Sequence, residues 1–209
     1  MREMLALLLL IISGGCNAMP PYDAVHGATM KLGVPGGSCS GTAVGHYTIL
    51  TAGHCFYNDK GKTTKPASIT ANGETCEVWR LVDDGNDHVF LTVSGCKFNH
   101  RAKLGLPAKT GDEVFIWGNP MFLDDQLRVG RASGYGYLPS SDESPVLAKR
   151  FQFFDISSTY GDSGSAIFNL SGEIVGVLSI GTDPITRPFH LMGALPLTFT
   201  FAQWKDAGL

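Results

Sequence analysis

The sequence has no run of lysine or arginine, no internal repeat and no low-complexity stretch. Its formal net charge is −3 over 209 residues, which provides no electrostatic basis for binding a nucleic-acid backbone. No two cysteines form a Cys-x-x-Cys pair, so their spacing does not indicate a metal site, and no pattern calls for an organic cofactor. We therefore expect no nucleic-acid partner, no metal and no cofactor.

An apolar run over residues 5–12 is too short to cross a bilayer, which needs about 20 apolar residues. With the small residues that follow, it predicts a secretory signal over residues 1–15, outside the fold. The approach to Cys16 resembles a bacterial lipobox, in which this cysteine becomes lipidated, although Ser13 stands where a leucine-like residue is usual. A simple cut after Ala18 is the alternative. Both predict export, either lipid-anchored through Cys16 in the periplasm or outer membrane, or secreted.

Setting Cys16 aside leaves an even set of cysteines, at positions 39, 55, 76 and 96. An exported protein lies in a compartment that permits disulfides, so two bridges are expected. The count alone leaves three pairings open.

Short apolar runs separated by Gly, Pro, Asn and Asp recur along the chain, which predicts an all-β protein built of barrels or sandwiches. The 26 glycines, well above the roughly 7% average, also favour a turn-rich β fold. Residues 169–172 predict a hairpin turn, and residues 198–207 a short helix. The predicted strands cover residues 41–50, 76–82, 88–93, 113–117, 127–132, 150–154, 165–169, 174–180 and 190–195.

Three short motifs supply a nucleophile, a base and a carboxylate. Ser163 lies in GDSGS (161–165), His54 lies in TAGHC (51–55), and Asp87 directly precedes an apolar run. A serine hydroxyl needs an imidazole to take its proton and a carboxylate to fix the tautomer of that imidazole. Each motif alone is also an ordinary turn, a buried histidine or a strand-entry residue. Their combination in the order His, Asp, Ser indicates nucleophilic catalysis.

Asp83 and Asp84 are neighbouring candidates for the carboxylate. Asp87 is favoured because the apolar run after it would place it at the mouth of a buried strand, where its charge is shielded from water.

The chain resembles the trypsin-like (chymotrypsin-fold) serine peptidases, in the style of their compact bacterial and viral members. Residues 39–42 and 47–55 resemble the family's strand, turn and catalytic histidine. Residues 111–120 resemble the start of the second barrel in the periplasmic high-temperature-requirement proteases. Residues 166–177 resemble the hairpin after the catalytic serine. Most of the chain after about residue 30 is covered, in the expected order.

The resemblance implies two Greek-key β-barrels packed with the active site in the cleft between them, and a short C-terminal helix. Residues 16–105 would hold a linker and the first barrel, with His54 and Asp87, and residues 106–209 the second barrel, with Ser163. It also implies the disulfides Cys39–Cys55, beside the catalytic histidine, and Cys76–Cys96.

The activity implied is that of a serine endopeptidase acting on polypeptide substrates, with the backbone N–H groups of Gly161 and Ser163 as the oxyanion hole. Many animal members mature by inserting a new aliphatic N-terminus beside the aspartate before the nucleophile. No segment here resembles that terminus, since residues 34–37 form a turn without a basic cleavage site. We expect an enzyme that needs no such cleavage.

The resemblance places the substrate pocket between two short segments. Ser157 stands where an acidic pocket base would select Lys or Arg, so that preference is not expected. Leu178 replaces the histidine of glutamate-specific relatives, which leaves a small or apolar side chain as the expectation. The implied pocket residues are Ser157, Ser158, Thr159, Ser179, Ile180 and Gly181.

Two other functions compete with this interpretation of the sequence. A non-catalytic binding lipoprotein that retains the protease fold would be marked by a broken triad, and no member is missing. An esterase of the α/β-hydrolase type would show a Gly-x-Ser-x-Gly elbow and the order Ser, Asp, His, which this chain does not.

Overall fold

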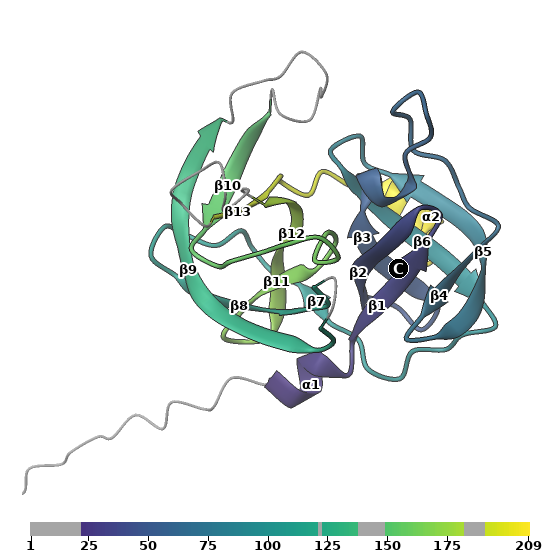
Figure 1. Ribbon diagram of the computed structural model, residues 1–209, viewed down its shortest axis with the longest axis horizontal. Coiled ribbons are helices and arrows are strands. Elements are labelled where there is room, and N and C mark those ends of the chain that lie inside the picture. The colour runs from purple at the N-terminus through teal and green to yellow at the C-terminus, as the bar shows by residue number, and fades with distance from the viewer. Residues whose placement is uncertain (1–21, 121–122, 138–148, 182–190) are drawn as a thin grey trace, which may run out of the picture.

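The computed structural model describes residues 22–120, 123–137, 149–181 and 191–209. Figure 1 shows two bodies of strands side by side, with the short helix α1 (Tyr22–His26) at the start of the described chain. Helix α2 (Phe201–Asp206) follows the last strand of the second body but lies against the strands of the first. The predicted all-β architecture with a short C-terminal helix is confirmed.

The first body is a closed barrel of antiparallel strands in the order β1-β2-β3-β6-β5-β4. Val89, Leu91 and Val93 of one strand belong to its interior core, whereas Phe90 between them belongs to the core shared with the second barrel. The continuous apolar run after Asp87 is therefore a strand buried on both faces. The strands are β1 (Thr29–Val34), β2 (Gly37–Ala43), β3 (Thr48–Ala52), β4 (Ser68–Ala71), β5 (Glu74–Asp83) and β6 (His88–Ser94).

The second body has the strand order β11-β8-β9-β10-β13-β12-β7, and β11 also pairs with β12, which closes six of these strands into a second barrel. The seventh strand, β7, adds parallel to β12 at the edge. The strands are β7 (Lys103–Leu104), β8 (Glu113–Gly118), β9 (Gln126–Tyr137), β10 (Arg150–Phe154), β11 (Ala166–Asn169), β12 (Glu173–Gly181) and β13 (Met192–Ala194).

The core shared by the two barrels lies between the interior core of the first barrel and that of the second. Phe90 of the first barrel stacks on Phe199, with ring centroids 3.9 Å apart, and Trp204 of α2 packs beside both rings. Thr200 and Gln203 form a reciprocal capping box that starts α2 at this position. The segment after the second barrel thus crosses back and covers the first.

Local boundaries differ from the prediction at several places; for example, β9 continues to Tyr137, beyond the predicted residues 127–132. The predicted strand over residues 41–50 is two strands, because a turn around Gly45 interrupts it, with Val44 N and Gly45 N both donating to the carbonyl of Thr48. Strands β1, β4 and β7 and helix α1 were not predicted, since their few apolar residues give weak patterns. The predicted strand 190–195 is observed as β13, and its first position lies outside the described residues.

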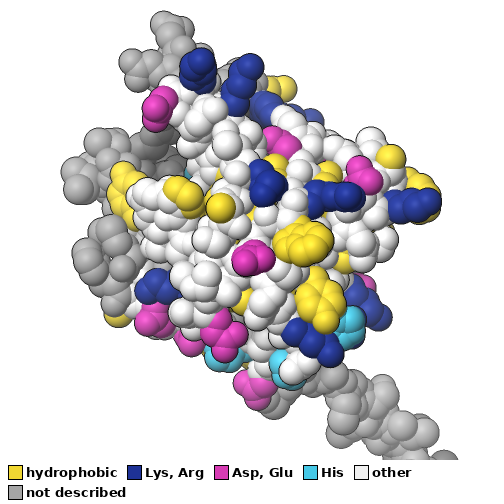
Figure 2. All heavy atoms as spheres, turned by 90° about the vertical axis from the view of Figure 1, so that its right-hand side faces the viewer, with side chains coloured by type: hydrophobic (Ala, Val, Ile, Leu, Met, Phe, Trp, Pro, Cys, Tyr) yellow, Lys and Arg dark blue, Asp and Glu magenta, His cyan; other side chains and the backbone are white. Residues whose placement is uncertain are grey.

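On the first-barrel side of the molecule, acidic and basic side chains are interspersed and apolar side chains emerge among them (Figure 2). No helix within the described ranges is long and apolar enough to span a membrane. Cys16 and the predicted signal lie outside the described residues.

Candidate active site

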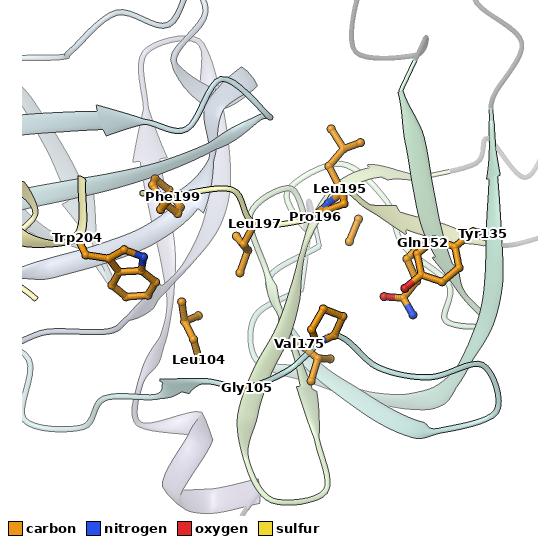
Figure 3. Close-up of a pocket in the computed structure, with 12 residues that line it drawn as sticks. Leu104, Gly105, Tyr135, Gln152, Val175, Leu195, Pro196, Leu197, Phe199 and Trp204 are labelled. Carbon is orange, nitrogen blue, oxygen red and sulfur yellow. The ribbon is translucent and has the colours of Figure 1, made fainter. Parts of the chain in front are cut away.

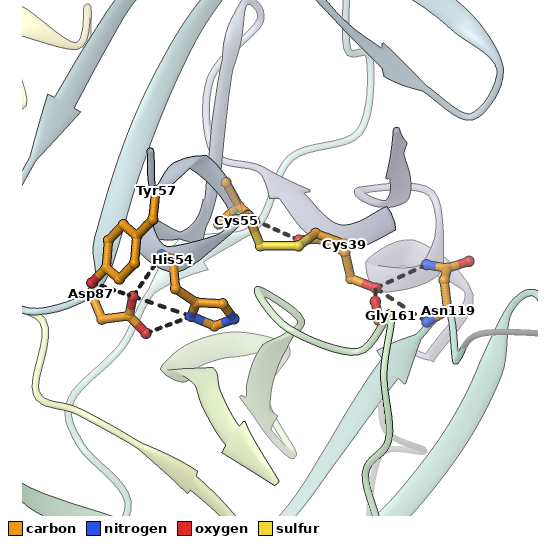
Figure 4. The surroundings of a disulfide bond; sticks show 9 residues. Cys39, His54, Cys55, Tyr57, Asp87, Asn119 and Gly161 are labelled. Atoms are coloured by element: carbon orange, nitrogen blue, oxygen red, sulfur yellow. Dashed lines mark hydrogen bonds and ion pairs between the residues drawn. A yellow bond between two sulfur atoms is a disulfide. The ribbon is translucent and has the colours of Figure 1, made fainter. Parts of the chain in front are cut away.

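His54 lies on a single 3-10 turn, η1 (Gly53–Phe56), that follows β3 directly. The disulfide between Cys39 of β2 and Cys55 of η1 ties this turn to the neighbouring strand, as Figure 4 shows. The N–H of Tyr57 donates to the carbonyl of His54 at 3.3 Å and closes the turn. The imidazole is therefore carried by backbone anchored on both sides.

Asp87 ends the loop between β5 and β6 and meets His54 in two ways. Its Oδ2 lies 2.9 Å from Nδ1 of His54, and its Oδ1 accepts the backbone N–H of His54 at 2.7 Å (Figure 4). The Asp87 side chain is fully buried, whereas that of His54 is 30% exposed. Because an ionised carboxylate accepts hydrogen bonds only, Nδ1 carries the proton and Nε2 has a free lone pair.

The backbone of Asp87 sustains this arrangement. Asp87 has a φ of 69°, in the left-handed region, and its carbonyl accepts the N–H of Gly53 at 2.8 Å. A Cβ at Gly53 would lie about 3.3 Å from the Asp87 backbone, so the glycine permits the close approach of loop and turn. Such a conformation costs energy at a non-glycine residue and persists where its surroundings fix it.

The neighbouring aspartates have other partners. Asp84 pairs with His88 at 2.9 Å in a fully buried contact, and also accepts the N–H of Thr198 at 3.0 Å. Burial alone would raise the pKa of Asp84, but hydrogen bonds from His88, Thr198 and Asn86 hold it below its usual value. Asp83 accepts the N–H of Gly85. Within the described part of the chain, Asp87 is the aspartate that contacts His54.

Ser163 lies in the turn that leads into β11, and this turn is pressed between the barrels. Its carbonyl accepts the N–H of Ser40 on β2 at 2.8 Å, while the N–H of Gly164 donates to Leu178 on β12 at 2.8 Å. Gly164 has a φ of 85°, and a Cβ there would overlap Thr51 and the Ser40 carbonyl. Ser163 thus lies next to β3, the strand that leads into the turn carrying His54.

The hydrogen bonds of the described residues do not include one between the Ser163 hydroxyl and His54. Such bonds are often long in a free enzyme and tighten with substrate.

Two backbone donors beside Ser163 are free. Gly161 adopts a φ of 94°, and its carbonyl is turned away to accept the hydroxyl of Ser40 at 2.9 Å. Neither the N–H of Gly161 nor that of Ser163 makes a hydrogen bond to any described residue. In the described part of the chain, both N–H groups are therefore available to donate hydrogen bonds to a ligand.

Asp162, between these donors, is fully buried and paired with Arg128 of β9. The guanidinium donates to both carboxylate oxygens, at 2.8 Å for Nη1 to Oδ2, and Nη1 also donates to the carbonyl of Ser157. The N–H of Thr159 adds a further bond to Asp162 at 2.9 Å. Arg128 therefore holds the turn from Ser157 to Ser163 in place through its hydrogen bonds to Ser157 and Asp162.

The predicted pocket residues come from two segments that approach each other. Gly181 lies so close to Ser158 that a Cβ added to the glycine would be 2.5 Å from the Ser158 hydroxyl. The hydroxyls of Ser158 and Ser179 are buried without a hydrogen-bond partner among the described residues. Ser157 and Thr159 are exposed, and Ile180 is half-buried on the edge of β12.

Among the cavities lined by described residues, one lies away from the predicted site and one lies beside Asp87. An apolar one of about 300 Å³ lies between the second barrel and the segment leading to α2, and none of the predicted site residues lines it (Figure 3). A polar one of about 320 Å³ adjoins Asp87 and is lined also by Tyr57, Lys62 and Asp83. Among the described residues, no cluster of three or more His, Cys, Asp or Glu could hold a metal ion.

Both expected disulfides are present, and the second, Cys76–Cys96, ties β5 to the end of the first barrel. Arg128, Ser40 and Tyr57 were not predicted from the sequence as parts of this site. Their contacts join segments remote along the chain, or involve residue types too common to signal a site, so no motif pointed to them.

The chain is similar to known peptidases in sequence and in fold. The family model described as a trypsin-like peptidase domain matches residues 39–177, about two thirds of the chain, a span that includes His54, Asp87 and Ser163. A probable periplasmic serine endoprotease DegP-like of Ectopseudomonas mendocina (strain ymp) is 32% identical over 121 residues, which are 55% of this chain. The match takes in 24% of that protein, so the chain spans about a quarter of its length.

The fold is similar to that of the Rv3671c protease from M. tuberculosis. Its active form gives a TM-score of 0.71 at 18% identity and covers 90% of this chain and 85% of that one. Its inactive form gives 0.68 at 18% identity, over 91% and 94% of the two chains. At this identity the likeness describes the shared fold.

Proposed function

The chain belongs to the trypsin-like peptidase family, and on that premise we propose that it is a serine endopeptidase that cleaves polypeptides through a triad of His54, Asp87 and Ser163. The observation that carries the proposal is the pairing of His54 with the buried Asp87 carboxylate at 2.9 Å, beside the turn that holds Ser163. An imidazole held in this way offers Nε2 as a base to an adjacent hydroxyl.

In the proposed reaction, Ser163 Oγ bonds to the peptide carbonyl carbon while its proton passes to Nε2 of His54. The carbon–nitrogen bond then breaks as His54 gives this proton to the leaving amine, which leaves an acyl-enzyme. A water molecule then attacks the acyl carbon while its proton passes to His54. The bond to Ser163 Oγ breaks, His54 returns the proton to this oxygen, and the new carboxyl end is released. Asp87 stays ionised throughout and stabilises the imidazolium.

The N–H groups of Gly161 and Ser163 would hold the oxyanion of the tetrahedral intermediate. Both are unpaired among the described residues, which supports this role. Losing one such donor typically costs about 3 kcal/mol of transition-state stabilisation.

The enzyme would need no N-terminal cleavage for activity. The pairing of Asp162 with Arg128 supports this, because a positive partner for the buried carboxylate is already supplied from within the chain. Activity of a freshly purified chain without added protease tests the point, and strict dependence on trimming would reject it.

The substrate side chain before the cleaved bond would be small or apolar rather than Lys or Arg. The uncharged Ser157 at the pocket-base position supports this, as does the close approach of Ser158 and Gly181. A cleavage profile on a peptide library tests it.

The protein would act outside the cytoplasm, since two disulfides are typical of oxidising compartments. We propose in addition that Cys16 carries a lipid that anchors it in the bacterial envelope. Labelled palmitate should then enter the wild-type chain but not a Cys16→Ser variant.

The decisive experiment is labelling with a fluorophosphonate probe, which reacts with an activated serine. Wild-type protein should be labelled and should cleave peptides, and Ser163→Ala should lose labelling and several orders of magnitude in kcat. Ser171→Ala, on the exposed hairpin turn, is the matched control and should behave as wild type. Wild-type protein that neither labels nor cleaves would leave a binding module with a protease fold.

A further inference from the structure

The Asp87 carboxylate has a second side-chain donor besides His54. The hydroxyl of Tyr57 lies 3.3 Å from Oδ1, and Figure 4 shows it directed at the carboxylate from the side opposite the imidazole. Within the described part of the chain, no other side chain donates to Asp87.

The backbone holds Tyr57 in place without help from Asp87. Tyr57 ends the turn that carries His54, and it pairs with Thr63 across an isolated β-bridge. The loop between them is closed by Asn58, whose side chain accepts the N–H groups of Lys60 and Lys62. The Tyr57 ring meets the His54 ring edge-on, with centroids 6.4 Å apart.

The Tyr57 hydroxyl keeps its proton. Burial, then the charge of Asp87 and the hydrogen bond to it, raise the pKa of Tyr57 well above its usual range. The hydroxyl is therefore a donor over the whole pH range in which a serine peptidase acts.

We infer that Tyr57 is a positioning residue for the proposed triad, acting through Asp87 and resting on the function proposed above. Together with the backbone N–H of His54, its hydrogen bond holds Oδ1, so that Oδ2 is the oxygen nearer to Nδ1 of His54, at 2.9 Å against 3.2 Å. The bond also draws part of the negative charge away from the imidazole. Hydrogen bonds to a charged group are among the stronger ones in proteins. Tyr57 thus sets the orientation of the Asp87 carboxylate and the share of its negative charge that acts on the His54 ring.

The other charged groups around the pair do not replace this bond. Asp83 and Lys62 line the polar cavity beside Asp87. Asp84 is engaged by His88, and Asp162, before Ser163, by Arg128. None of them donates a hydrogen bond to Asp87 in the described structure, so removal of the hydroxyl leaves Oδ1 short of one donor.

The test is Tyr57→Phe, which removes only the hydroxyl. More negative charge would then act on His54 and favour its protonated form, so the acidic limb of kcat/KM should move up by about 0.5 to 1 pH unit. At pH 6, kcat/KM should fall about threefold to tenfold, mainly through kcat, and recover toward wild type at pH 9. Tyr47→Phe, on an exposed tyrosine of the first barrel, is the matched control and should change neither quantity.

A second readout does not depend on turnover. In full-length Ser163→Ala protein, NMR titration of the His54 ring should show the same upward shift when Tyr57→Phe is added, with its signals assigned by a His54→Gln variant. An unchanged acidic limb and an unchanged titration midpoint would overturn the inference, even if Tyr57→Phe lowers the melting temperature. Wild-type protein that shows no peptidase activity would instead reject the proposed function, while the titration of His54 would still test the role of Tyr57.

Discussion

At the scale of single residues, three aspartates within five positions have three different environments. Asp83 caps a turn, Asp84 is surrounded by donors including His88, and only Asp87 contacts His54. The positive φ of Asp87 separates it from the other two, because it turns the side chain back across Gly53. A local backbone conformation thus selects one carboxylate from a chemically equivalent set.

Asp87→Asn tests this selection. An amide can donate to Nδ1, which would stabilise the tautomer that carries its proton on Nε2 and remove the base. We expect kcat to fall about 10⁴-fold with the fold retained. The comparison is Asp83→Asn, which should keep kcat within a few-fold, and a similar loss in both variants would contradict the assignment. Steady-state kinetics and circular dichroism are sufficient.

The sequence was informative about residues that act through a local motif and silent about those that act through a distant contact. His54 and Asp87 were predicted from short words and their order, and the structure brings them into contact. Arg128 lies 34 positions before Asp162 in a strand without a motif, so no local sequence pattern predicts their pairing. Tyr57 resembles any aromatic residue after a turn. Such roles exist only once the barrels are assembled.

At the scale of elements, strand β9 supports the turn that follows β10. Arg128 reaches from this strand to the carboxylate of Asp162 and the carbonyl of Ser157, so one side chain fixes both ends of the turn that carries the free donors. Removing one partner of a buried ion pair leaves an uncompensated charge, which is strongly destabilising locally.

Arg128→Ala should therefore disturb the turn. We expect kcat to fall by about 10² to 10³, the effect of losing one oxyanion donor, together with slower fluorophosphonate labelling. Arg131→Ala is a matched control on the same strand, since its contact with Glu113 at 3.5 Å is exposed. Labelling of Arg128→Ala at the wild-type rate would show that the turn holds its shape without the ion pair.

Elements were predictable in proportion to their apolar content. The buried strand β6 follows directly from the run after Asp87, whereas β1 and β4, with Lys31, Gly33 and Ser68, do not show a clear alternation. The break at Gly45 was missed because apolar residues flank it closely on both sides. The two-barrel arrangement itself came from the resemblance, since strand count alone does not separate it from a sandwich.

At the scale of the whole molecule, Asp84 links the barrels. It lies on a loop of the first barrel and accepts both the N–H and the hydroxyl of Thr198, which follows the second barrel. Its lowered pKa means that the ionised form stabilises the folded state. This contribution is present above the ordinary value of 3.8 and is lost as pH falls through the lower, folded-state value.

Asp84→Asn should thus lower the free energy of unfolding at pH 7 and make less difference as pH falls below about 4. Denaturant unfolding of both proteins at several pH values measures this. Asp59→Asn, at an exposed loop position, is the control and should have little effect. A difference that stays constant down to pH 2 would contradict the linkage.

The crossing of residues 196–207 from one barrel to the other means that the two halves of the gene do not encode separable modules. A first half expressed alone would present Leu50 and Phe90 to water, because Phe199 and Trp204, which belong to their core, are supplied by the second half. A second half alone would carry α2 with no surface to cover. A chimaera with one half taken from a related protein would fold only if residues 196–207 were exchanged together with the first barrel, which they cover.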